Sequence, residues 1–221
     1  MWEPLVADNG STITAEHFRY LGAHTVPEDD FLRQLNQEAS AAGIPAISIP
    51  WEQASFIQIL LKLCEAREVI EVGTLAGYSA IAMARALRPH GRLRTIEINP
   101  AYADFAERWI ARSDVADRIQ VFRGPGRDIL PTFPDNSADA AFLDADKASY
   151  PLYLDESLRI VRRGGLIMAD NAFAFGQLLD EAATDPKVLA VRTFNDLMAA
   201  QNGLHAIIVP FMDGCWVAVR L

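Results

Sequence analysis

Cysteine and histidine are scarce in this sequence. The two cysteines, Cys64 and Cys215, have no Cys or His neighbour at metal-ligand spacing, and the four histidines form no zinc motif. We therefore expect both cysteines to be small apolar residues of the core, in a reducing compartment.

Long apolar runs and an excess of positive charge are also missing. No run approaches the roughly 18 apolar residues of a membrane span, and no basic, then apolar leader opens the chain. We expect a soluble cytoplasmic protein with no membrane partner. The formal net charge of −9 argues against a broad nucleic-acid surface, because phosphate contacts need clustered Lys and Arg. A local basic patch could form from Arg85, Arg88, Arg92 and Arg94, although solvated helix and turn faces explain these arginines better.

Apolar residues make up 51% of the chain and fall in short runs that alternate with helical patterns. The N-terminal patterns predict helices over 14–21, over a segment that begins at Pro27 and ends at Gly43, and over 51–66. Strands are then predicted at 69–72, 93–98, 119–123, 139–143 and 166–169, with helices at 79–87, 102–112, 128–132 and 150–160. A turn is predicted at 163–165. A long helical region is predicted at 174–200, with a break at 184–186. Two strands at 204–209 and 215–220 are predicted to form a hairpin.

Five consecutive strand–helix units imply a parallel sheet with helices on both faces, to which the hairpin adds an antiparallel edge. The expected fold is therefore α/β, with seven mostly parallel strands. The length fits a single domain, 1–221. Within it we expect a helical N-terminal segment, 1–66, that covers the site, and a ligand-binding core, 67–221.

The stretch from Glu71 to Ser79 reads as a glycine turn between a strand and a helix. Such a turn places bare backbone and a helix N-terminus beside a ligand. Only Gly73 and Gly77 are present, so the dinucleotide fingerprint G-x-G-x-x-G is incomplete, and the Lys of a P-loop is absent. Neither a pyrophosphate nor a triphosphate is therefore well served by this turn.

Two acidic residues narrow the choice of ligand. Glu71 would repel a phosphate but suits a cation, and Glu97 ends the next strand, where such folds bind ribose hydroxyls. A ligand with a ribose, a positive centre and no phosphate is S-adenosylmethionine. The simpler alternatives are a local hydrogen bond for Glu71 and a solvated strand end for Glu97.

Polar residues also follow two later strands. Asp144 ends the strand at 139–143, and Asp170 and Asn171 end the strand at 166–169. Since the carboxyl ends of neighbouring strands face one crevice, the three side chains should converge into an all-oxygen site that suits Mg²⁺. The alternative is ordinary helix capping by Asp and Asn. Lys147 lies three residues past Asp144 and is a candidate general base, or else a surface lysine.

The chain resembles the cation-dependent class I O-methyltransferases, which include catechol and caffeoyl-CoA O-methyltransferases, from about Phe31 onward. The resemblance rests on the run from Val69 to Ser79, on Phe142 to Lys147 with Tyr150, and on Asp170-Asn171. It implies a Rossmann-like methyltransferase fold and a homodimer. It also implies Asp144, Asp170 and Asn171 as ligands of Mg²⁺ or another divalent cation such as Mn²⁺ or Ca²⁺, and Lys147 as the base. The S-adenosylmethionine residues that it implies are Ile49, Glu71, Gly73, Thr74, Ser79, Glu97, Gly126 and Asp144.

The activity that follows from this resemblance is methylation of one hydroxyl of a small aromatic vicinal diol. Two alternatives remain open: methylation of 5-hydroxyuridine in tRNA, and a non-catalytic S-adenosylmethionine-binding protein. In this family the acceptor pocket draws on segments that correspond here to 1–30 and 173–176. Phe173, Phe175 and Trp51 are candidates to stack on an aromatic ring, with core packing as the alternative.

Overall fold

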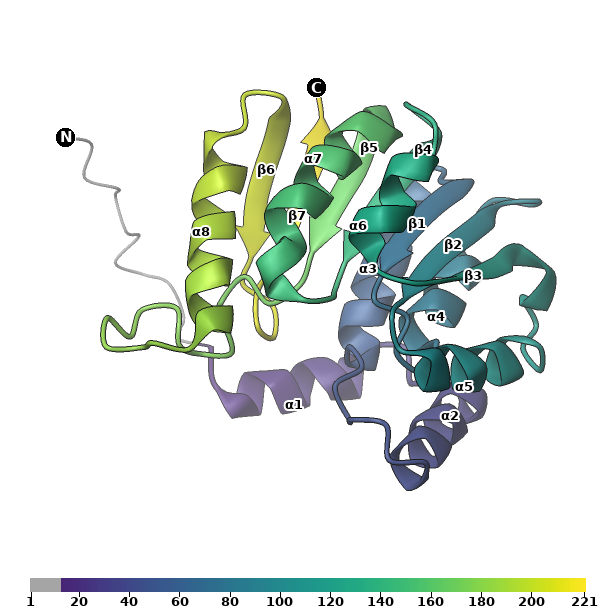
Figure 1. Cartoon of the computed structure of the whole chain (residues 1–221). Coiled ribbons are helices and arrows are strands. Elements are labelled where there is room, and N and C mark those ends of the chain that lie inside the picture. The colour runs from purple at the N-terminus through teal and green to yellow at the C-terminus, as the bar shows by residue number, and fades with distance from the viewer. Residues whose placement is uncertain (1–12) are drawn as a thin grey trace.

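The computed structural model describes residues 13–221, and its centre is a seven-stranded sheet with helices on both faces (Figure 1). The strands are β1 (Glu68–Val72), β2 (Arg92–Glu97), β3 (Ile119–Arg123), β4 (Ala138–Leu143), β5 (Val161–Ala169), β6 (Leu204–Val209) and β7 (Cys215–Arg220). Their order in the sheet is β3-β2-β1-β4-β5-β7-β6. β1 to β5 pair in parallel, whereas β7 runs antiparallel to both β5 and β6. The predicted fold class, with its antiparallel terminal hairpin, is confirmed.

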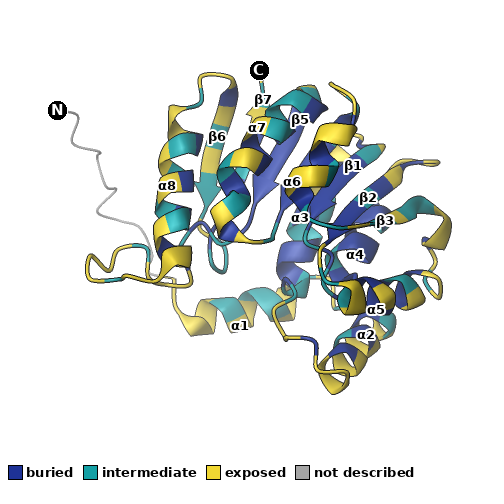
Figure 2. Ribbon diagram, in the orientation of Figure 1, coloured by how far each residue is buried: buried dark blue, intermediate teal, exposed yellow. Residues whose placement is uncertain are grey.

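The helices pack in two layers, and each layer has its own apolar core. The α-helices are α1 (Ala15–His24), α2 (Asp30–Ala41), α3 (Trp51–Leu63), α4 (Tyr78–Ala86), α5 (Pro100–Ile110), α6 (Gly126–Ile129), α7 (Tyr150–Ile160) and α8 (Pro186–Ala200). Short 3₁₀ turns are η1 (Ala116–Arg118), η2 (Leu130–Thr132) and η3 (Lys147–Ser149). α2 to α5 enclose one core with the sheet, and α7 and α8 enclose the other. Figure 2 shows the central strands buried between these layers, whereas α1 has no buried residue.

β1 illustrates how the sequence produces this arrangement. Successive strand residues point to opposite faces, so Val69 joins the core under α3 and α4 while Ile70 and Val72 join the core under α7. A strand buried on both faces is therefore apolar throughout. Apart from Glu68, the half-buried first residue of β1, the exception is Glu71, which is fully buried although it carries a carboxylate.

The predicted turn at 163–165 is wrong. These residues belong to β5, which begins at Val161. The pairing of β5 with β4 jumps from Val161–Ala138 to Leu166–Ala140, so residues 162–165 form a bulge. Gly164 has φ +73°, and a Cβ on Gly165 would lie 2.6 Å from the backbone oxygen of Asp139. The glycines allow a tight bulge here rather than a turn between elements.

The helix predicted for 174–183 is also wrong, since α8 begins only at Pro186 and the preceding residues form turns. Asn171, Ala174 and Phe175 all have positive φ, which a right-handed helix excludes. The helix predicted to begin at Pro27 instead begins at Asp30, because the Asp29 carboxylate accepts a hydrogen bond from the Leu32 amide at 2.9 Å.

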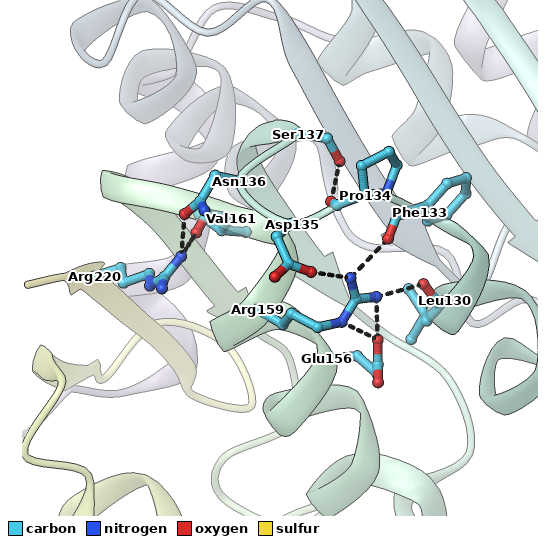
Figure 3. A network of polar contacts seen from close by, with 10 residues as sticks. All are labelled: Leu130, Phe133, Pro134, Asp135, Asn136, Ser137, Glu156, Arg159, Val161 and Arg220. Atoms are coloured by element: carbon cyan, nitrogen blue, oxygen red, sulfur yellow. Dashed lines mark hydrogen bonds and ion pairs between the residues drawn. The ribbon is translucent and has the colours of Figure 1, made fainter.

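Two arginines tie helix, loop and strand together at the amino ends of β4 and β5 (Figure 3). Arg159, near the end of α7, donates to the backbone oxygens of Leu130 and Phe133 and pairs with the carboxylates of Asp135 and Glu156. Arg220 on β7 donates to Asn136 and to the Val161 backbone oxygen. This network therefore stabilises the edge of the sheet opposite the carboxyl ends of these strands.

The structure bears on the two cysteines and on membrane spans within residues 13–221. Cys215 is fully buried and Cys64 is partly buried, and both are free thiols. Within this part of the chain, every helix is too short or too polar to cross a bilayer.

Candidate active site

A cavity of about 570 Å³ opens where the parallel strands β1, β2, β4 and β5 end. Its wall includes every predicted site residue except Glu71, that is Ile49, Gly73, Thr74, Ser79, Glu97, Gly126, Asp144, Lys147, Asp170 and Asn171. The fold thus gathers residues from six separate segments into one site. Their chemical roles follow from the local contacts.

Glu71 lies fully buried behind the cavity wall. Its Oε1 accepts a hydrogen bond from the Ser79 hydroxyl at 2.5 Å, whereas its Oε2 is buried without a hydrogen-bond partner among residues 13–221. Burial raises the pKa of Glu71 to about 8, although the Ser79 hydrogen bond opposes this rise. The Ser79 bond agrees with the local alternative for Glu71, but Oε2 has no partner among residues 13–221, and a positively charged ligand beside it would favour the ionised carboxylate.

The burial of Glu71 predicts how stability depends on pH. Between pH 4.5 and about 8 the folded protein keeps the Glu71 proton that the unfolded chain loses, so stability should fall as pH rises through this range. Glu71→Gln cannot titrate, and we expect its unfolding free energy to fall less between pH 5 and 8. Urea unfolding of the ligand-free protein measures this slope, with Glu181→Gln, an exposed position, as the control. Equal slopes for Glu71→Gln and wild type would contradict the raised pKa.

The glycine turn follows β1 and packs against the backbone at the end of β4. Gly73 has φ +106°, and a Cβ there would lie 2.0 Å from the backbone oxygen of Asp144, so only glycine fits. The Leu75 amide donates to Glu97 Oε2 and the Asn99 amide donates to Glu97 Oε1, both at 2.8 Å. Glu97 is buried and braces the turn, which contradicts the alternative of a solvated strand end.

Asp144, Asp170 and Asn171 face the same cavity from the ends of β4 and β5. Burial and then the negative charge of Asp144 raise the pKa of Asp170 to about 6, while a 2.7 Å hydrogen bond from Gln53 lowers it. The two carboxylates are therefore close enough to repel each other. No helix follows Asp170 and Asn171 directly, which contradicts the helix-capping alternative for this pair.

The set of side chains that could act as metal ligands is small. Among residues 13–221, no group of three or more His, Cys, Asp and Glu side chains is placed to hold a metal ion. The predicted ligand set has two carboxylates, and its third ligand is the amide oxygen of Asn171. Such a set suits a hard cation that completes its shell with water or substrate oxygens.

Lys147 is buried, which contradicts the surface-lysine alternative. Its Nζ donates to the Tyr150 hydroxyl at 2.5 Å and to Asp144 Oδ1 at 3.3 Å. The Tyr150 hydroxyl donates in turn to the Leu143 backbone oxygen at 3.0 Å. Burial raises the pKa of Tyr150 well above its ordinary value, so this phenol stays neutral and orients the lysine.

The three aromatic candidates separate in the structure. Phe175 lines the cavity and is 46% exposed, whereas Trp51 and Phe173 lie outside the cavity wall. Phe173 packs against Gly214, where a Cβ would lie 2.9 Å from its ring. The turn that carries Phe175 is fixed by Asp213, whose carboxylate accepts from the amides of Phe175 and Gly176.

Sequence reasoning missed two residues near the cavity. Gln53 is buried in the first turn of α3 and holds Asp170. Tyr78 is buried in the cavity wall and donates to Glu28 at 2.8 Å. The one available signal for Gln53 was a polar side chain at the start of an apolar helix. Tyr78 carried no signal, because its partner lies 50 residues earlier in the chain.

Comparisons with known proteins agree with this geometry. A family model described as O-methyltransferase matches residues 22–221. A catechol O-methyltransferase of Niastella koreensis is 42% identical over 200 residues, which cover 87% of this chain and 90% of the relative. A catechol O-methyltransferase of Mycobacterium tuberculosis is 36% identical and covers 85% of this chain and 84% of the relative. The crystal structure of an O-methyltransferase from Bacillus cereus in complex with SAH is 33% identical. It superposes with a TM-score of 0.86 and covers 92% of this chain and 96% of its own.

Proposed function

The chain belongs to the O-methyltransferase family, and from this premise we propose that it methylates one hydroxyl of a small aromatic vicinal diol. The methyl donor in this proposal is S-adenosylmethionine, and a divalent cation assists. The observation that carries the proposal is that Asp144, Lys147, Asp170 and Asn171 face one cavity beside the glycine turn. Two relatives named as catechol O-methyltransferases support the diol as the acceptor.

The residues around the glycine turn fit the donor. SAH, bound in the Bacillus cereus relative, is S-adenosylmethionine without its methyl group. The unpartnered buried oxygen of Glu71 suits a positive group, and Glu97 and Gly73 line the cavity next to it. Ser79, Thr74, Ile49, Gly126 and Asp144 complete the proposed donor site. When bound, S-adenosylmethionine supplies an electrophilic methyl group on a sulfonium.

The acid set fits a divalent cation, Mg²⁺ or an ion with similar oxygen preference such as Mn²⁺ or Ca²⁺. Asp144, Asp170 and Asn171 would hold the ion, and two adjacent carboxylates in one cavity favour a positive charge between them. Such an ion supplies charge neutralisation and lowers the pKa of a bound hydroxyl. Gln53 keeps Asp170 oriented through its hydrogen bond.

Lys147 is the proposed base. Tyr150 and Asp144 hold its Nζ within the buried part of the cavity wall, so the amine has little freedom to leave the site. A neutral Lys147 can take the proton of an acceptor hydroxyl, which leaves the oxygen free to accept the methyl group. Phe175 adds an apolar ring to the same cavity, where an aromatic acceptor can pack.

The two alternatives are less well supported. Three of the four arginines of the suggested basic patch are engaged in ion pairs: Arg85 with Asp29 and Asp114, Arg88 with Glu65, and Arg94 with Glu68. Paired arginines offer little attraction to tRNA phosphates. A non-catalytic role disagrees with the family, whose relatives are named as enzymes. A homodimer remains part of the proposal on the resemblance alone, and a cytoplasmic location on the composition of the chain.

An activity screen tests the proposed acceptor. The purified protein is incubated with S-adenosylmethionine and Mg²⁺ and with catechols, caffeoyl esters, flavonoid diols or tRNA that contains 5-hydroxyuridine. We expect mono-methylated products from vicinal diols and none from matched monophenols, because the cation needs two adjacent oxygens. Mass spectrometry of the products gives the answer. Methylation of tRNA, with every diol left unchanged, would overturn the proposal in favour of the first alternative.

A further inference from the structure

Tyr78 connects the cavity to the N-terminal helices. It is the first residue of α4, directly before Ser79, and only 2% of it is exposed. Tyr78 belongs to the cavity wall, and its hydroxyl donates to Glu28 Oε1 at 2.8 Å. Glu28 lies in the segment between α1 and α2, and its side chain is 17% exposed. One side chain of the cavity wall thus contacts a segment that is outside the sheet.

Other contacts hold Glu28 and its segment in place. The Arg33 guanidinium donates to the Glu28 backbone oxygen at 2.7 Å and lies 3.8 Å from its Oε2. The next residue, Asp29, caps α2 and pairs with Arg85, which lies on α4 as Tyr78 does. The segment between α1 and α2 is therefore attached to α4 at two points, one of which lies in the cavity wall.

α1 itself has few means of attachment. None of its residues is buried, although its Gly22 approaches α3 so closely that a Cβ would lie 2.8 Å from Glu52 Oε1. α1 is therefore held mainly by the approach of Gly22 to α3 and by the segment that follows the helix. The Glu28–Tyr78 bond is the one that reaches the cavity wall, and its loss would leave a buried phenol without a partner in residues 13–221.

We propose that Glu28 is a positioning residue for the methyl donor. Its hydrogen bond to Tyr78 fixes the first turn of α4, including Ser79, and at the same time docks the segment between α1 and α2. Donor binding and docking of this segment then stabilise each other, because coupling between two sites is reciprocal. The inference rests on the proposed function only in placing the donor in this cavity.

Calorimetric titration with SAH tests this coupling without an acceptor. We expect Tyr78→Phe and Glu28→Ala each to raise the SAH dissociation constant about three- to tenfold, the loss of one hydrogen bond. Glu28→Gln keeps an acceptor oxygen and should bind SAH as wild type does. The double variant Tyr78→Phe/Glu28→Ala should bind no more weakly than the weaker single variant, since both remove the same bond. Glu16→Ala on α1, whose side chain is 85% exposed, is the control.

Hydrogen exchange supplies a second readout that a purely structural contact would not change. SAH should slow the exchange of amides in 13–30 in wild type and slow it less in Tyr78→Phe, which keeps the buried ring. The KM for the donor should rise in this variant while kcat at saturating donor stays unchanged. Equal SAH affinity in all variants, or SAH-independent exchange in 13–30, would overturn the inference. Failure of the wild type to bind SAH would instead overturn the proposed donor site.

Discussion

Asp144→Ala should lower kcat/KM by about 100-fold or more, and excess chelator should stop turnover of the wild-type enzyme. Both changes remove the proposed cation, whose stabilisation of charge amounts to several kcal/mol, and each 1.36 kcal/mol is a factor of ten in rate. Asp144 also accepts a hydrogen bond from Lys147, so the variant loses one contact of the base. Initial rates with a catechol acceptor, with and without EDTA, measure both effects.

The controls separate loss of the cation from loss of the fold. Asp155→Ala removes an exposed carboxylate on α7 and should leave the rate unchanged. Excess Mg²⁺ should restore the chelated wild type but not Asp144→Ala. Thermal unfolding of each variant confirms that it is folded. Full activity in EDTA would show that the cation has no role in the reaction.

Lys147→Met should lower kcat by about 100- to 10,000-fold, the range for loss of a general base. Methionine fills a similar volume, so the buried position keeps its packing while the amine is lost. SAH affinity should stay within about threefold of wild type, because the proposed role of Lys147 lies with the acceptor proton. Single-turnover rates measure the loss of catalysis, and calorimetry measures the SAH affinity.

Lys187→Met is the matched control for this variant. Lys187 also lines the cavity, but it is exposed and lies at the start of α8. Its replacement should change kcat by no more than a few-fold. If Lys147→Met turned over the acceptor as fast as wild type, Lys147 would not be the base, and the proton would have to leave by another route.

The convergence of the site could be predicted from sequence, because it depends on a general property of parallel sheets. Gly73, Asp144 and Asp170 each follow an apolar strand, and the carboxyl ends of such strands meet at one edge. The two wrong predictions, at 163–165 and 174–183, concern segments whose conformation depends on tertiary contacts. Residues 163–165 bulge out of the pairing between β4 and β5, and the positive φ values near Phe175 are stabilised by Asp213, 38 residues later. Neither contact leaves a local pattern.

The N-terminal segment shows the same limit. Periodicity predicted helices in 14–43, but nothing in it indicated that Glu28 would contact Tyr78. The prediction that 1–66 covers the site concerns a stretch whose first 12 residues lie outside the described part of the chain. Within the described part, Ile47, Ser48 and Ile49 line the cavity, so this segment does contribute to the site wall.

The pairing of β1 with β4 has a consequence for how this enzyme folds. Val69 lies beside Ala140 and Val72 beside Leu143, so strands about 70 residues apart in the chain must find one register. The proposed donor turn follows β1, whereas Asp144 and Lys147 follow β4, so the site cannot assemble before this pairing forms. The chain loses loop entropy before the stabilising contacts between the strands form, and such pairing is therefore slow. In a refolding experiment, enzymatic activity should therefore return only with the completed sheet, later than the helical signal.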